Sequence, residues 1–213
     1  MIHSVDTILA LVLLSILFSY GYSQLFRLII VVGFQGIVVS IVPFFIGHDM
    51  TAGGIVFTIA TLLIRGIIIP MSIYIAMKKR AIQSKVAPII GYQASILCGL
   101  GVIVAATYIS RQLNIPSISN YTLLFPTAIA LPVTGMFLLM TRRNAIAMVL
   151  GYIIMENGIY LIGTTISVRA LHIVEFGILL DVLAGVMIMA TILQTIERTF
   201  DDVDTENLRT LKE

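Results

Sequence analysis

Hydrophobic residues in this chain gather into long runs that are separated by short polar links. Charged residues, Pro or Gly bound each of seven such runs, which cover residues 6–22, 28–46, 53–77, 86–109, 121–140, 145–166 and 171–196. An α-helix rises about 1.5 Å per residue, so these lengths suit a hydrocarbon core of about 30 Å, the first run marginally. Lipid cannot satisfy backbone polar groups, and the runs are far longer than barrel strands. The pattern therefore predicts an all-α integral membrane protein with seven transmembrane helices.

Composition supports this prediction and excludes other classes. Of the 213 residues, 59% are hydrophobic and 11% are charged, with a mean hydropathy of +1.06, whereas soluble domains carry about 25% charged residues. The net charge of +2 is too small to indicate binding to nucleic acid. The single cysteine, Cys98, excludes a disulfide framework, a CxxC pair and a cysteine-ligated cluster, and we expect it to be buried and inert. No set of metal ligands is visible.

The basic residues predict how the chain is oriented in the membrane. The first apolar run lacks a basic leader and a convincing cleavage site, so we expect a retained helix rather than a signal peptide. Basic residues gather in the links that would share one side: Arg27, Lys78, Lys79, Arg80, Lys85, Arg142, Arg143, Arg198, Arg209 and Lys212. The other side carries only Arg111 and Arg169. The positive-inside rule then predicts an outside N-terminus and a cytoplasmic C-terminus.

The links also predict how the chain is divided. A polar loop at residues 111–120 is the longest link on the outer side. It separates a four-helix N-terminal membrane part, residues 1–118, from a three-helix part, residues 119–196. A polar cytoplasmic tail, residues 197–213, follows; it is either a solvated end or a docking segment for a cytoplasmic partner.

Four ionisable residues lie inside the apolar runs: Arg65, Glu156, Glu175 and Asp181. A charge at the bilayer centre costs about 2.5–3.5 kcal/mol on insertion scales, so such residues usually face the interior of the bundle. Arg65, Glu156 and Asp181 all fall near the middle of their runs, whereas Glu175 lies only about 7 Å below the outer face. We therefore expect an acidic partner for Arg65, with Glu156 and Asp181 as the candidates. A packing ion pair and participation in proton or ion movement are both open.

Glu156 has two phenols on its own predicted helix. Tyr152, Glu156 and Tyr160 are spaced i, i+4 and i+8, which places them along one face. Such groups can hold water beside a protonatable carboxylate, although tyrosines at this spacing are also ordinary packing residues.

A second polar group lies in the last run. His172 and Glu175 are i, i+3 neighbours near the outer face, and Asp181 follows at mid-depth. A proton path could enter at His172 and Glu175 and continue to Asp181 and Glu156.

Three further positions predict local features. Pro70 removes a backbone hydrogen bond and could kink the third run beside Arg65. Gln35 and Gln93 are more typical of hydrogen bonds between helices than of ligand binding.

The stretch MENGIYLIG (155–163), followed by VEFGILLDVLAGVMIM (174–189), resembles the hydrogenase-4 component E family. The stretch RGIIIP (65–70) is similar to the third helix of that family, where a basic residue precedes a proline. The resemblance covers nearly the whole chain and is most specific over residues 151–190. The C-terminal three helices are also similar to the K subunit of respiratory complex I and, more distantly, to the C subunit of Mrp-type antiporters.

The resemblance implies a function and a set of partners. It implies a non-catalytic membrane subunit of a complex I-like or group 4 [NiFe] hydrogenase-type oxidoreductase complex, located in a prokaryotic inner membrane. Its partners would be large antiporter-like membrane subunits and a peripheral arm with [NiFe] and iron–sulfur subunits, and it would carry no cofactor itself. Two buried glutamates of the K subunit take part in proton transfer; Glu156 matches the first, and either Glu175 or Asp181 the second. An Mrp-type antiporter subunit and a structural scaffold remain the alternatives.

Overall fold

The computed structural model describes residues 2–22, 24–46, 52–79, 90–113, 121–142 and 144–166, together with Gly177 and Gly185. The chain divides into two compact units, residues 1–174 and 175–213. All the helices described below belong to the first unit.

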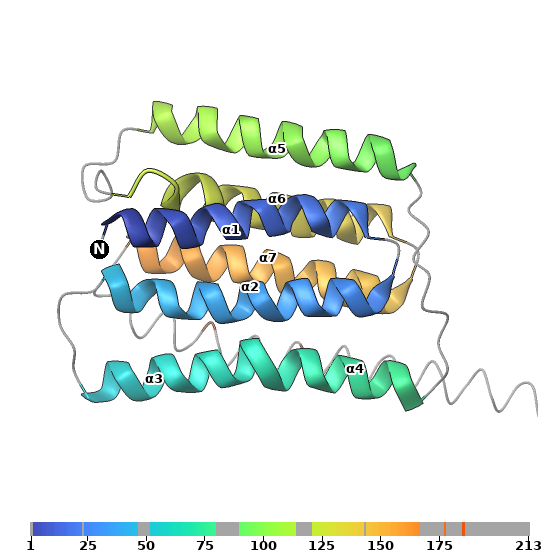
Figure 1. Ribbon diagram of the computed structural model, residues 1–213, viewed down its shortest axis with the longest axis horizontal. Coiled ribbons are helices and arrows are strands. Elements are labelled where there is room, and N and C mark those ends of the chain that lie inside the picture. The colour runs from blue at the N-terminus through green and yellow to red at the C-terminus, as the bar shows by residue number, and fades with distance from the viewer. Residues whose placement is uncertain are drawn as a thin grey trace, which may run out of the picture. The chain divides into compact units, whose positions relative to one another are not determined.

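The described part of the first unit is built from helices (Figure 1). In chain order these are α1 (Ile2–Gly21), α2 (Leu25–Ile46), α3 (Ala52–Leu63), the π-helical turn η1 (Ile64–Ile68), α4 (Ile69–Lys79), α5 (Tyr92–Gln112), α6 (Leu124–Thr141) and α7 (Ala145–Ile166). Because α3, η1 and α4 follow one another without a break, they form one long irregular helix.

In the part of the chain that the structure describes, five helical stretches are long and apolar enough to cross a membrane: Leu25–Ile46, Thr58–Ile75, Tyr92–Gln112, Leu124–Thr141 and Ile146–Gly163. The apolar part of α1, Val5–Gly21, is shorter, as the marginal length of the first run predicted. Each of the first six predicted runs therefore forms a helix over most of its described residues. The seventh run, 171–196, lies outside the described residues apart from Gly177 and Gly185.

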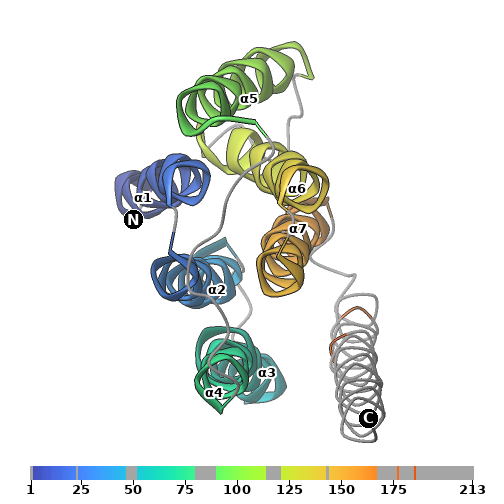
Figure 2. The same cartoon turned by 90° about the vertical axis from the view of Figure 1, so that its right-hand side faces the viewer.

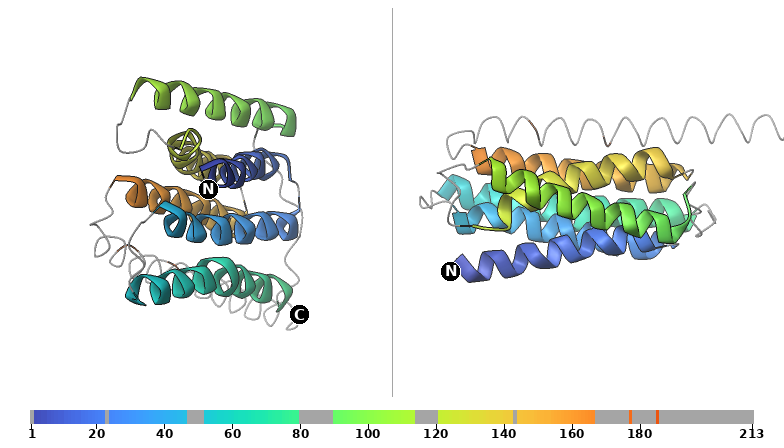
Figure 3. Two further views of the ribbon diagram at one scale, coloured as in Figure 1. Left: turned by 60° about the vertical axis from the view of Figure 1, so that its left-hand side comes forward. Right: turned by 90° about the horizontal axis from the view of Figure 1, so that it is seen from above.

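Within the first unit the helix axes run roughly along one another (Figure 3). Viewed end-on, α1, α2, α6 and α7 are neighbours, α5 lies beside α6 and α1, and the α3–η1–α4 helix lies beside α2 (Figure 2). Helices from either side of residue 118 thus pack directly together, because α1 contacts α6 and α2 contacts α7.

Glycines bring α6 and α7 into the closest contact of the bundle. A Cβ atom on Gly135 would lie 2.5 Å from the carbonyl oxygen of Gly151 and 2.6 Å from Cβ of Met155. A Cβ atom on Gly158 would meet the ring of Pro132 at 2.6 Å. Small residues let transmembrane backbones approach closely, so these glycines determine where α7 lies against α6.

Cys98 corrects one of our expectations. It lies on α5 and is exposed, not buried. The buried residues of α5 are Ser95, Gly99 and Ala106, so only one narrow face of that helix packs inward. Because α5 is apolar on all sides, hydrophobicity alone could not show which face would be buried.

Candidate functional site

The candidate site is centred on Arg65, which lies in η1 and is 5% exposed. The N–H of Ile69 donates to the carbonyl oxygen of Ile64, the i→i−5 bond of a π-turn. Pro70 follows directly, and because it has no N–H it cannot donate the α-helical bond to the carbonyl of Gly66. A π-turn that contains Arg65 thus directly precedes Pro70; the kink expected at Pro70 stays a prediction.

A glycine on α2 lets this turn approach the rest of the bundle. A Cβ atom on Gly36 would lie 2.6 Å from the carbonyl oxygen of Arg65 and 2.9 Å from its carbonyl carbon. Contacts that close do not occur for real side chains, so only glycine fits at this position. The backbone of η1 therefore lies directly on α2, within reach of α7, which packs against α2.

The guanidinium of Arg65 contacts two residues of α7. Its Nη1 donates to Oδ1 of Asn157 at 3.2 Å. Its Cζ lies 4.7 Å from the centroid of the Tyr160 ring, within the range of a cation–π interaction. The Tyr160 side chain also forms a hydrogen bond with the side chain of Thr61 on α3. One hydrogen-bonded and stacked cluster thus joins α3 and η1 to α7.

Glu156 lies next to this cluster on α7. Its side chain is 7% exposed, Asn157 is fully buried, and Tyr152 is half-buried. Residues three and four apart are neighbours on a helix surface, so Glu156 and Tyr160 share a face. The structure thus brings together Arg65, Glu156 and Tyr160 from the predicted site. The pairing of Arg65 with Glu156 or Asp181 stays a prediction.

Three predicted site residues, His172, Glu175 and Asp181, lie outside the described residues. Among the residues that are described, no three or more His, Cys, Asp and Glu side chains are placed to hold a metal ion together.

Three residues of the site, Asn157, Thr61 and Gly36, were not predicted from the sequence. Asn157 carried a usable signal, because it is a second polar residue beside Glu156 in an otherwise apolar run and can accept from a donor-only arginine. Gly36 carried no signal that distinguishes it from other glycines, since its role depends on which helix packs against it.

Other buried polar side chains join α1 to the rest of the bundle. Nε2 of Gln35 donates to Oγ of Ser15 at 2.8 Å, which confirms Gln35 as a helix-to-helix contact. Gln93, in contrast, is exposed at the start of α5. The hydroxyl of Tyr20 donates to Oγ1 of Thr134 at 3.3 Å. Among the described residues, Oε1 of Gln35 and Nδ2 of Asn157 are buried without a hydrogen-bond partner.

Opposite charges connect α1 and α6 at their two ends. Asp6 accepts from the N–H of Leu123 at 3.1 Å and from Oγ1 of Thr122 at 3.0 Å, at the N-terminus of α6. Arg142, just after α6, donates from Nη2 to the carbonyl oxygen of Tyr20 at 3.0 Å, in the last turn of α1. Asp6 lies at the partially positive N-terminus of α6, and Arg142 lies at the partially negative C-terminus of α1, so each charge interacts favourably with the helix dipole. Burial lowers the pKa of the Arg142 guanidinium.

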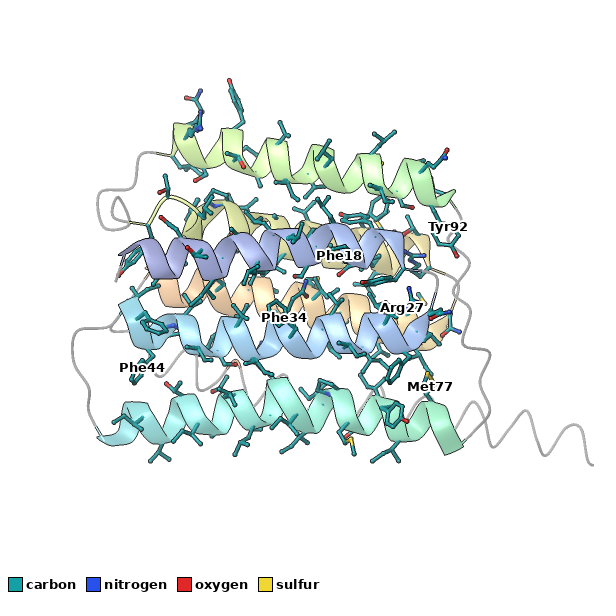
Figure 4. All side chains as sticks on the ribbon, in the orientation of Figure 1. Phe18, Arg27, Phe34, Phe44, Met77 and Tyr92 are labelled. Atoms are coloured by element: carbon teal, nitrogen blue, oxygen red, sulfur yellow. The ribbon has the colours of Figure 1, made fainter. Side chains whose placement is uncertain are left out.

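These contacts show that α1 and α6 run in the same direction. Arg142 therefore lies at the α1–α2 end of the unit, where Figure 4 also shows Arg27, Met77 and Tyr92, while Phe44 lies at the other end. The described residues that flank three of the links predicted to share one side of the membrane, those after α1, after α4 and after α6, are thus at one end of the bundle; the tail, 197–213, lies outside the described residues.

The side chains around Arg65 are chemically suited both to proton transfer and to holding helices together. Arg65 supplies only hydrogen-bond donors, and Glu156, within a helical turn of the residues that bind Arg65, supplies a carboxylate that can accept or release a proton. Phenol and amide groups beside that carboxylate supply hydrogen-bonding positions. Such a cluster can hold and pass a proton, and it can also hold helices together.

Known proteins resemble this chain over different parts of its length. Residues 123–213 match the family model for NADH-ubiquinone/plastoquinone oxidoreductase chain 4L, which includes α6, α7 and Glu156. The hydrogenase-4 component E of Escherichia coli K12 is 28% identical over 118 residues, covering 55% of this chain and 54% of component E. The chain is similar to hydrogenase-4 component E, and its C-terminal part to chain 4L.

A further relative covers almost the whole chain. An uncharacterized protein of Mycobacterium tuberculosis is 27% identical over 207 residues, covering 95% of this chain and 93% of that protein. The component E of Shigella flexneri matches to the same extent as that of Escherichia coli, so this chain spans about half the length of these component E proteins. No solved structure gives a significant match.

Proposed function

We propose that this chain is a non-catalytic membrane subunit of a complex I-like or group 4 hydrogenase-type complex in a prokaryotic inner membrane. In it, buried carboxylates take part in proton translocation that is driven by redox chemistry in partner subunits. The similarity to component E and chain 4L supports the membership. The observation that carries the role is Glu156, a carboxylate that is 7% exposed within the chain 4L-like part and next to the Arg65 cluster.

Part of the proposed proton path, at Glu156, Tyr152 and Tyr160, lies in the described residues. A proton enters near His172 and Glu175, reaches mid-depth at Asp181 and Glu156, and meets Tyr152 and Tyr160 beside Glu156. Arg65 contributes a permanent charge at that depth. The N-terminus is outside and the C-terminus cytoplasmic in this proposal. The partners are large antiporter-like membrane subunits and a peripheral arm with [NiFe] and iron–sulfur subunits, and this chain carries no cofactor.

Two experiments test the proposal in sequence. The first is a mild-detergent pull-down of the tagged native protein followed by mass spectrometry. Recovery of antiporter-like subunits together with nickel–iron or iron–sulfur proteins supports membership of such a complex. The redox proteins recovered also indicate which electron donor the complex uses. Recovery with antiporter subunits alone would instead favour an Mrp-type transporter.

The second experiment measures proton translocation in inverted membrane vesicles that are supplied with that electron donor. Glu156→Gln removes the protonatable group at almost unchanged volume, whereas Met155→Leu changes the neighbouring position without removing a polar group. We expect Glu156→Gln to assemble normally and to lose at least about tenfold in proton translocation, in the range of one general acid–base group. If Glu156→Gln assembles and translocates as Met155→Leu does, Glu156 is a packing residue and the proposed role is wrong.

A further inference from the structure

Arg65, the cation of the site, lies in the N-terminal part of the chain. The residues that it contacts lie in the C-terminal, chain 4L-like part. Arg65 lies in η1, far before residue 123, where the match to chain 4L begins. Asn157 and Tyr160, which it contacts, lie on α7 inside that match. The N-terminal helices therefore insert a charged group into the chain 4L-like part.

The two α7 residues receive the guanidinium in a defined geometry. Arginine has donors and no acceptor, so the Asn157 amide must turn its oxygen toward Arg65. That oxygen accepts the 3.2 Å hydrogen bond, while the Tyr160 ring lies 4.7 Å from the guanidinium carbon. Residues three apart are adjacent on a helix surface, so amide and ring contact the cation together.

The same geometry places the cation close to Glu156. Glu156 directly precedes Asn157 and is four residues before Tyr160. One helical turn covers about 5.4 Å, so the bound guanidinium is held within about one turn of the carboxylate-bearing residue. A charge at that separation inside a protein interacts strongly with a second charge.

We propose that Asn157 is a positioning residue, which together with Tyr160 holds the Arg65 cation beside Glu156. The proposal rests on the proposed function, because it gives Arg65 a role through Glu156. Asn157 does not exchange protons in it. It determines where the charge of Arg65 lies, and the proton-transfer step depends on that charge.

The chemistry of the cluster favours this role over packing alone. Taking a guanidinium and an amide out of water costs free energy that apolar residues of the same volume would not cost. Arg65 also lies in a π-turn whose backbone is pressed against Gly36, so the position of the guanidinium is fixed by the backbone that carries it.

The test uses the native complex in inverted vesicles, with proton translocation measured per assembled complex. Asn157→Leu removes the acceptor at similar volume, and Asn157→Gln keeps a neutral amide acceptor on a side chain one methylene longer. We expect Asn157→Leu to lose about tenfold, because misplacement of a charge near a reacting group slows the reaction. Asn157→Gln should recover a large part of the wild-type rate.

A double variant separates positioning from packing. If Asn157 acts through Arg65, then Arg65→Gln combined with Asn157→Leu should be no slower than Arg65→Gln alone. Independent packing defects would instead multiply, because effects of residues that do not act as a unit add as free energies. Losses that multiply, or equal rates for Asn157→Leu and Asn157→Gln, would overturn the proposal.

A second variant, Gly36→Ala, should displace Arg65 without changing a polar side chain. The added Cβ of Gly36→Ala would overlap the Arg65 backbone, whereas a Cβ on Gly101 of α5 would meet nothing within 4 Å. We expect Gly36→Ala to reproduce the loss seen with Asn157→Leu, and Gly101→Ala to behave as the wild type. This pair decides the matter if Asn157→Leu fails to assemble; equal rates for the two alanine variants would then contradict the proposal.

These variants distinguish failure of the proposed proton relay through Glu156 from failure of the positioning role of Asn157. If Glu156→Gln has no effect, the proposed relay fails and the positioning role falls with it. If Glu156→Gln abolishes translocation while Asn157→Leu and Gly36→Ala translocate normally, only the positioning role is wrong.

Discussion

Replacing Gly135 by alanine should separate α6 from α7, because this glycine lies at their closest approach. The new Cβ would lie 2.5 Å from the carbonyl oxygen of Gly151 and 2.6 Å from Cβ of Met155. Ordinary van der Waals contact requires 3.4–4 Å. One of the atoms involved is backbone, so no side-chain rotation can relieve the overlap, and α7 must move by roughly 1 Å.

The expected cost follows from a comparison with Gly101→Ala on α5. Both variants gain the same helix propensity, roughly 0.5–1 kcal/mol for alanine over glycine. Only Gly135→Ala overpacks an interface, which typically costs about 1–3 kcal/mol. The difference between the two variants should therefore be about 1–3 kcal/mol in the free energy of unfolding, with Gly135→Ala the less stable.

Unfolding of the purified protein in bicelles, followed by steric trapping or by titration with a denaturing detergent, measures this difference. The same displacement moves Met155 and its neighbour Glu156, so proton translocation in the assembled complex should fall as well. If Gly135→Ala and Gly101→Ala differ by less than about 0.5 kcal/mol, the close contact of α6 with α7 is not present in the membrane and the reasoning is wrong.

Two other predictions concern the ends of the helices. Asp6→Ala should destabilise the protein by about 0.5–2 kcal/mol, because the N-terminus of α6 loses its capping carboxylate; Asp6→Asn should recover much of that, and equal stability of Asp6→Ala and wild type would argue against the contact. A membrane-impermeant maleimide should label Gln112→Cys in intact cells but leave Gln24→Cys unlabelled, both in a Cys98→Ala background, and the reverse pattern would contradict the proposed orientation.

The hydrophobic pattern by itself was enough to infer that the chain lies in a membrane and which segments form helices. Long apolar runs can bury their backbone in lipid only as helices, so the six runs that the structure describes were predictable to within a few residues. The cost of placing a charge in lipid likewise singled out Arg65 and Glu156 from their positions in the apolar runs alone. The kink expected at Pro70 stays a prediction, although a π-turn does precede that residue.

The neighbours of each helix were decided only by the tertiary structure. A helix that is apolar all round carries no periodic signal for its buried face, so the expectation that Cys98 is buried was wrong. Depth along a helix could be counted from the sequence, but rotation about its axis could not. Depth suggested Glu156 or Asp181 as the acidic partner of Arg65, which stays a prediction. That Asn157 and Tyr160 also contact Arg65 was decided by packing through Gly36. Such contacts depend on close approach between two backbones, which no single segment of the chain encodes.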